Sequence, residues 1–111
     1  MKVSELSPKI DETLEFNYSK QKFIPNSFGC YIISNFMHEI MYVGKATSLK
    51  NRFTNHLETP EKTHLTKLGK AYWFSYKLCE NEHEIIKLER GWLNTYELKH
   101  GQLPIFNKIH A

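Results

Sequence analysis

Residues 29–52 read GCYIISNFMHEIMYVGKATSLKNR, and this stretch decides the fold of the chain. Residues 29–34 are apolar and rich in β-branched side chains, and residues 40–46 repeat the pattern, which predicts two strands. The polar loop at 35–39 is short, as in an antiparallel hairpin. The stretch therefore predicts a hairpin that passes directly into the next element.

Downstream of the hairpin, residue spacing predicts a first helix over 49–57, a third strand over 71–78 and a second helix over 82–99. Asn81 and Gly101 flank the second helix and are residue types that favour its start and its end. The order strand, strand, helix, strand, helix favours an α+β domain. We expect a small three-stranded, mainly antiparallel sheet flanked by helices.

The residues upstream of the hairpin carry the weakest signal. Spaced apolar residues over 4–17 fit either a short helix broken by Pro8 or a loosely packed arm. We therefore expect residues 1–22 to form an N-terminal arm or short helix, and residues 23–111 to form the domain.

Length and composition exclude several classes of protein. The chain has 111 residues, a formal charge of +3 and 41% hydrophobic residues, which fits one folded domain. It has no apolar run of about 20 residues, so no membrane partner is expected. Residues 1–10 contain no apolar signal segment, and Cys30 and Cys79 are too few for a disulfide framework. These features predict a cytoplasmic protein with reduced thiols.

The charge is distributed unevenly along the chain. Residues 44–77 hold seven basic and two acidic residues, whereas the rest of the chain has a net charge of −2. The middle third is therefore a candidate surface for phosphate or DNA, with a solvated lysine face as the alternative. The candidate phosphate-binding lysines are Lys45, Lys50, Lys62, Lys67 and Lys70.

Glu89 breaks the pattern of the second predicted helix. Six apolar residues share one arc of the helical wheel: Ile85, Ile86, Leu88, Trp92, Leu93 and Tyr96. Glu89 projects inside that arc, where a carboxylate is costly unless it is paired, hydrogen-bonded or bound to a metal. A salt bridge to Arg52 or a contact with a tyrosine would stabilise the Glu89 carboxylate in a purely structural role. A metal ligand is the functional alternative.

Two further pairs are candidates for phosphate chemistry. Arg52 and His56 lie four residues apart and so share a helix face, where each is either a phosphate ligand or an ordinary residue at the core edge. Tyr31 and Tyr42 lie in the two hairpin strands near glycines, where tyrosines are commonly packing residues. Taken singly, each residue is ambiguous.

Together, these residues resemble the GIY-YIG nuclease family. The first motif reads Gly29-Cys30-Tyr31 and the second reads Tyr42-Val43-Gly44, with the usual isoleucines replaced at packing positions. Residues 43–52 are similar to the N-terminal nuclease domain of the bacterial excinuclease. Glu89 and the terminal Pro104-Ile105-Phe106-Asn107 match the later motifs. His56 stands where that domain usually has tyrosine.

The resemblance implies a catalytic role for each matched residue. Glu89 would hold one Mg²⁺ (or Mn²⁺), whose other positions are filled by water, as magnesium prefers. Tyr42 would be the general base, and Tyr31 would place water or phosphate. A tyrosine with an ordinary pKa near 10 is a poor base at neutral pH, so nearby cations would have to lower its pKa.

The remaining matched residues would bind phosphate or orient the site. The resemblance implies that Arg52 binds the scissile phosphate and that His56 is a second phosphate donor or a proton carrier. Asn107 would orient Glu89 or another site group by a hydrogen bond.

The resemblance implies a metal-dependent endonuclease that nicks DNA with little sequence specificity, in repair or recombination. The alternative is a non-catalytic DNA-binding or interaction module that retains the fold. The complete set of motif residues favours the enzyme. RNA is an alternative substrate. On duplex DNA, one chain would nick one strand, and a homodimer is the alternative that would cut both.

Overall fold

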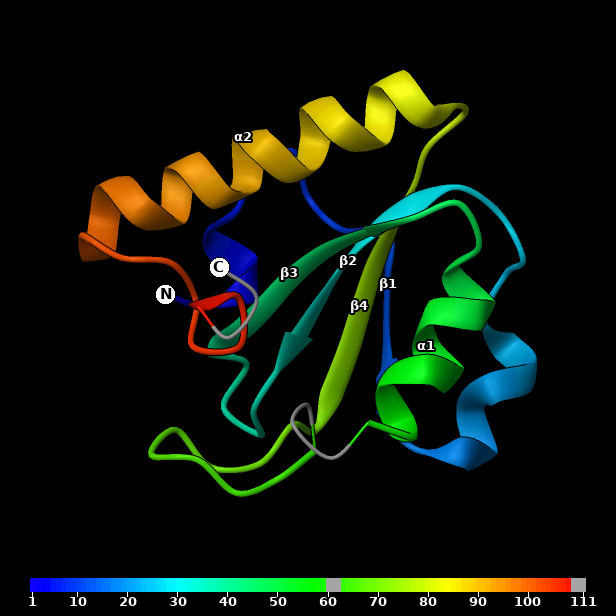
Figure 1. Ribbon diagram of the computed structural model, residues 1–111, viewed down its shortest axis with the longest axis horizontal. Coiled ribbons are helices and arrows are strands. Elements are labelled where there is room, and N and C mark those ends of the chain that lie inside the picture. The colour runs from blue at the N-terminus through cyan, green and yellow to red at the C-terminus, as the bar shows by residue number, and fades with distance from the viewer. Residues whose placement is uncertain (60–62, 109–111) are drawn as a thin grey trace.

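The computed structural model describes residues 1–59 and 63–108, which form a four-stranded antiparallel sheet with helices on both faces (Figure 1). The strand order is β1-β4-β2-β3, so β3 lies at one edge. The strands are β1 (Glu12–Glu15), β2 (Gly29–Ser34), β3 (Ile40–Ala46) and β4 (Trp73–Leu78). The predicted hairpin over 29–46 is confirmed, with Tyr31 opposite Gly44 and Ile33 opposite Tyr42.

The two predicted helices are confirmed as α1 (Leu49–Leu57) and α2 (Glu82–His100). Side-chain oxygens of Ser48 and Asn81 accept from backbone N–H groups in the first turns of these helices. Gly101 ends α2 with a φ of 72°, a conformation that glycine adopts without strain. Two short 3₁₀ helices, η1 (Val3–Glu5) and η2 (Tyr18–Phe23), precede the hairpin. No helix among the described residues is long and apolar enough to cross a bilayer.

The sheet separates two hydrophobic layers. Cys30, Ile32 and Val43 point to the face that α2 covers, where Trp92 is fully buried. The alternate residues of β2 point to the opposite face and pack against α1 and the fully buried Phe74. In Figure 1, α2 accordingly lies across one side of the sheet and α1 lies across the other.

The expectation of three strands is wrong, because the N-terminal residues supply a fourth. Residues 12–15 are neither a short helix nor a loose arm but form β1, which pairs antiparallel with β4 and sets Leu14 opposite Phe74. Val3 and Leu6 are buried, and the Trp92 indole donates to the Pro8 carbonyl oxygen at 3.1 Å. The strand predicted over 71–78 begins at Trp73. The boundary proposed at residue 23 stays a prediction.

Candidate functional site

Glu89 lies on α2 beside the edge strand β3. Its side chain is 20% exposed, and its Oε1 lies 3.3 Å from the Nζ of Lys45. The carboxylate is therefore paired, but with Lys45 rather than with Arg52, the partner that sequence reasoning named. The apolar arc predicted for this helix is buried only in part, since Ile85 is buried whereas Ile86 is 40% exposed.

A hollow of about 430 Å³ brings four of the predicted site residues together. It lies where the end of β3 meets α1 and the first half of α2. Its lining consists of Tyr42, Lys45, Ala46, Thr47, Arg52, Glu82, Ile85 and Glu89. Because α1 and α2 pack on opposite faces of the sheet, Arg52 and Glu89 reach the same hollow only around the outer edge of β3. The hollow is consequently rich in charged and hydroxyl groups.

Sequence reasoning missed two polar residues of this hollow, Thr47 and Glu82. Glu82 lies seven residues before Glu89, so the two carboxylates occupy one helix face two turns apart. That spacing was visible in the sequence. Thr47 follows Lys45 closely and carries no comparable signal.

Tyr31 and His56 form a buried pair beneath the hollow. Tyr31 is fully buried and His56 is 7% exposed, and the Tyr31 hydroxyl lies 2.6 Å from the His56 Nε2. The His56 ring also contacts the ring of Tyr42, with 5.3 Å between centroids. Tyr42 alone of the three lines the hollow. The structure thus gives Tyr31 and His56 positions from which they hold Tyr42.

Gly44 makes room for the two tyrosines. A Cβ at this position would lie 2.4 Å from the Tyr31 Cζ and 2.7 Å from the Tyr42 Cε2. Both distances are far inside van der Waals contact, so only glycine permits the rings to approach here. This close approach explains why a glycine stands in the middle of an otherwise β-favouring strand.

Burial raises the pKa of both tyrosines. For Tyr31, desolvation holds the pKa well above the ordinary value of 10. Desolvation also raises the pKa of Tyr42, while the Arg52 guanidinium and the Lys45 ammonium act in the opposite direction. Both phenols are therefore protonated at neutral pH in the protein alone.

Asn107 fastens the outer edge of β3. Its Oδ1 accepts from the Val43 N–H and its Nδ2 donates to the Val43 carbonyl oxygen, both at 2.9 Å. Val43 lies between Tyr42 and Gly44, so this clamp fixes the backbone that carries the second motif. Within residues 1–59 and 63–108, no hydrogen bond joins Asn107 to Glu89.

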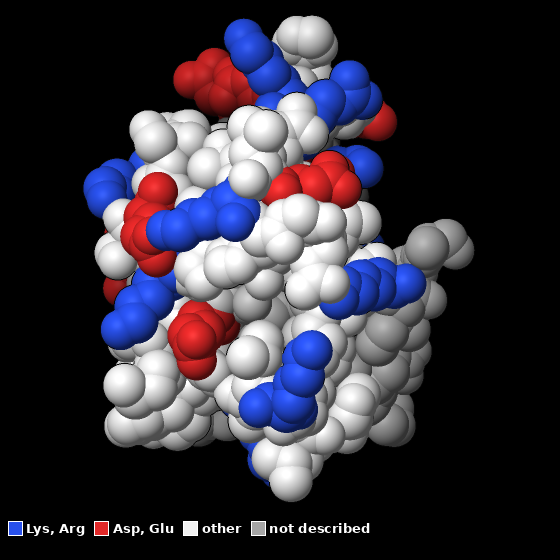
Figure 2. Space-filling view, turned by 90° about the vertical axis from the view of Figure 1, so that its left-hand side faces the viewer, with Lys and Arg blue, Asp and Glu red and all other residues white. Residues whose placement is uncertain are grey.

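The candidate phosphate-binding lysines do not form one cluster. Lys45 lines the hollow, whereas Lys50 is half-buried on α1, and its backbone N–H donates to a residue before β2. Lys67 and Lys70 are exposed on the connection before β4, and Lys62 lies outside the described residues. On the β3 side of the molecule, basic and acidic side chains are interspersed with uncharged surface (Figure 2).

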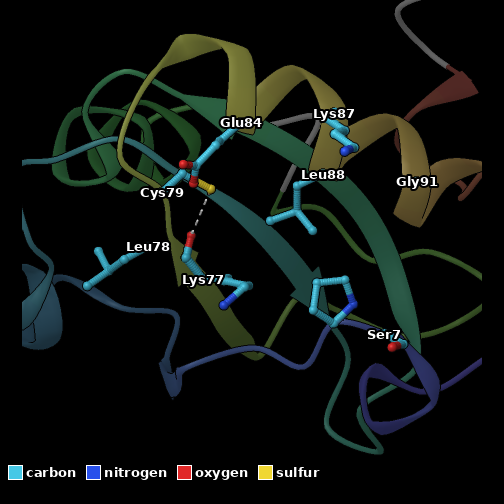
Figure 3. A pocket seen from close by; sticks show the side chains of 9 residues that line it. Ser7, Lys77, Leu78, Cys79, Glu84, Lys87, Leu88 and Gly91 are labelled. Carbon is cyan, nitrogen blue, oxygen red and sulfur yellow. Dashed lines mark hydrogen bonds between the residues drawn. The ribbon is translucent and has the colours of Figure 1, made fainter.

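A second hollow lies apart from these residues, on the side of α2 that faces η1 and the end of β4 (Figure 3). It has a volume of about 420 Å³ and is lined largely by apolar surface between Pro8, Leu78 and Leu88. The Cys79 Sγ donates to the Lys77 carbonyl oxygen at 3.9 Å. Among the residues that the structure describes, no predicted site residue lines this hollow.

The oxygen donors that line the hollow suit a hard cation in kind. The carboxylates of Glu89 and Glu82 and the hydroxyls of Tyr42 and Thr47 are all oxygen donors, which magnesium prefers over nitrogen and sulfur. In the described part of the chain, no group of three or more His, Cys, Asp or Glu side chains is placed to hold a metal. A cation here would keep several waters.

Comparisons with known proteins identify the family of this domain. Residues 27–101 match the model of the GIY-YIG catalytic domain family. The UvrABC system protein C of Clostridium beijerinckii is 33% identical over 91 residues, which cover 78% of the chain and 14% of that protein. The corresponding protein of Mycoplasma mycoides is 31% identical over 81 residues, which cover 72% of the chain and 14% of that protein.

Solved structures share the fold. The N-terminal endonuclease domain of UvrC from Thermotoga maritima, bound to magnesium as its catalytic divalent cation, superimposes with a TM-score of 0.60. The match has 24% sequence identity and covers 79% of this chain and 91% of that one. Since the chain spans only 14–16% of the length of several curated relatives, the resemblance concerns one domain of those proteins.

Proposed function

The chain belongs to the GIY-YIG catalytic domain family, and we propose that it is a divalent-metal-dependent endonuclease that hydrolyses phosphodiester bonds in DNA. The observation that carries the proposal is the hollow at the edge of β3. It gathers a carboxylate, a phenol and an arginine from three separate elements. Phosphodiester hydrolysis needs a metal ligand, a proton acceptor and a cation for the phosphate, and these three side chains supply them.

Glu89 would hold the metal through its carboxylate oxygens, while Glu82, two helical turns away, lines the far side of the same hollow. A bound Mg²⁺ neutralises charge that builds on the phosphate oxygens and lowers the pKa of water. Lys45, whose Nζ lies 3.3 Å from the Glu89 Oε1, would bind a phosphate oxygen next to the metal ligand. Manganese accepts similar oxygen donors and is the natural alternative metal.

Arg52 is exposed on α1 and its guanidinium reaches the hollow, so it would bind the scissile phosphate through paired N–H donors. Tyr42 would accept the proton of the attacking water. This role requires the phenolate, which burial disfavours and the neighbouring cations favour. His56 and Tyr31 would orient Tyr42 from beneath rather than contact the substrate.

We propose that the domain by itself nicks DNA with little sequence specificity, because one hollow of this size supplies phosphate contacts and few contacts to base edges. A single site cuts one strand at a time. A role in DNA repair is supported by the similarity to the UvrABC system protein C.

The test compares wild-type protein with the Glu89→Gln variant on supercoiled plasmid, with and without magnesium. Glu97→Gln is the matched control, since Glu97 is an exposed glutamate on the same helix. We expect magnesium-dependent nicking by the wild type and the control, and a loss of at least about a hundredfold in Glu89→Gln. Equal nicking by all three proteins would refute the metal site. DNA binding without cleavage by any of them would favour the non-catalytic alternative.

A further inference from the structure

The tip of the β2–β3 hairpin exposes two large apolar side chains in succession. Phe36 is 63% exposed and Met37 is 58% exposed. Tyr72, from the connection before β4, is 37% exposed and meets Phe36 edge to face, with 5.0 Å between ring centroids. Single exposed apolar residues are ordinary, whereas a contiguous apolar patch marks an interaction site.

The tip is held rigidly beneath these side chains. Asn35 is 4% exposed, and its Nδ2 donates to the Glu39 carboxylate at 2.9 Å and to the Leu68 carbonyl oxygen at 2.7 Å. The Trp73 indole donates to the Phe36 carbonyl oxygen at 3.1 Å. Phe36 and Met37 are therefore presented on a fixed backbone, which reduces the entropy lost when a partner binds.

Lysines flank the tip on both sides. Lys70 lines a hollow of about 220 Å³ together with Phe36, Met37 and Tyr72. Lys2 and Lys9 line the hollow on the other side of Met37. Among the described residues, none of these three lysines is in a salt bridge, while the carboxylate of Glu39 accepts from Asn35. An apolar tip between such cations is complementary to a base flanked by phosphates.

We propose that the hairpin tip binds unpaired or unstacked bases of DNA, with Phe36 and Met37 against the base and the flanking lysines on the phosphates. Proteins that open a base step insert apolar side chains of this kind, and aromatic rings stack on exposed bases without regard to sequence. The inference rests on the proposed endonuclease function and names its substrate class, which is duplex DNA that contains unpaired bases.

The tip and the candidate site are placed to contact the same DNA molecule. β3 begins beside the tip at Ile40 and carries Lys45 near its far end, at the hollow (Figure 1). Five residues of extended strand span about 17 Å, which is shorter than one turn of duplex DNA. The tip would therefore select the distorted position and present a nearby phosphate to the site.

The test measures binding in EDTA, so that cleavage is absent, by fluorescence anisotropy. The two probes have the same sequence, one fully paired and one with a three-base bubble. We expect the wild type to bind the bubble about tenfold more tightly, and the double variant Phe36→Ser, Met37→Ser to lose that preference while its affinity for the paired probe changes less than twofold. Leu98→Ser is the matched control, because Leu98 is 89% exposed on α2. Phe36→Trp should retain the preference, because tryptophan also stacks on bases, and the unchanged affinity of the double variant for the paired probe excludes a general folding defect.

The outcomes separate this inference from the proposed function. Equal affinity of wild type and double variant for the bubble would overturn the inference even if the protein nicks DNA. A dimer that the double substitution converts to a monomer, with DNA binding unchanged, would also overturn it and identify the tip as a self-association surface. Bubble binding that depends on Phe36, in a protein that does not nick, would support the tip and refute the endonuclease.

Discussion

Substitution of Gly44 by alanine tests the packing that holds the candidate site. The new Cβ would lie 2.4 Å from the Tyr31 Cζ, 2.5 Å from the Tyr31 hydroxyl oxygen and 2.7 Å from the Tyr42 Cε2. Relief of these contacts requires one or both rings to move by about 1 Å. Tyr31 has little freedom to move, because it is fully buried and stacks on Phe74 with 5.1 Å between centroids.

Overpacking of a fixed core costs about 1 to 3 kcal/mol, so the free energy of unfolding of Gly44→Ala should fall by this amount. For a domain of this size, the melting temperature should fall by about 5 to 20 °C. The nicking rate should fall even at temperatures where the variant is fully folded. The reason is that the displaced ring would be Tyr42, which lines the hollow.

The assays are thermal unfolding by circular dichroism and plasmid nicking at a temperature where both proteins are folded. Gly91→Ala is the control, since a Cβ there meets nothing within 4 Å and Gly91 lies inside α2. Alanine at a helix position should stabilise by about 0.5 to 1 kcal/mol. A Gly44→Ala protein with the melting temperature and activity of Gly91→Ala would refute the role assigned to Gly44.

Two further predictions concern the clamp on β3 and the buried phenol. Asn107→Ala leaves the Val43 N–H and carbonyl without their side-chain partner, so we expect a loss of about 1 to 3 kcal/mol in denaturant unfolding, with the exposed Asn94→Ala as an unaffected control. Burial raises the pKa of Tyr31 in the folded state above its unfolded value of about 10. The protonated Tyr31 phenol therefore contributes its whole stabilisation below about pH 10, and this contribution is lost as the pH rises through the folded pKa. Alkaline unfolding curves should therefore be flatter above pH 10 in Tyr31→Phe than in the wild type, and identical slopes would contradict the assignment.

The sequence predicted those elements that local patterns encode. The two hairpin strands, α1 and the start of α2 carry strong periodicity and capping residues, and the structure has them where they were expected. β1 was missed because Glu-Thr-Leu-Glu is short and has one apolar side chain. Its stability comes from pairing with β4, whose residues are about 60 positions away and leave no local signal.

Four of the predicted site residues line one hollow, but the contacts among them were not predictable from the sequence. The helical wheel placed Glu89 toward the sheet, but whether Lys45 or Arg52 would meet it depends on how α1 and α2 sit around the β3 edge. Likewise, the hydrogen bond between Tyr31 and His56 joins a strand to a helix 25 residues away. Side-chain partners of this kind follow from tertiary packing, which one sequence does not reveal.

The position of the hollow at the rim of the sheet has a consequence for protein engineering. Glu89 belongs to the layer on one face of the sheet and Arg52 to the layer on the other, so two independently packed cores set the span between them. A substitution that tightens one core shifts one of these side chains relative to the other, because packed interiors transmit small displacements. Substitutions selected only for a higher melting temperature are therefore expected to lower the rate of cleavage while the protein stays folded. Selection for stability and activity together would have to adjust the two cores together.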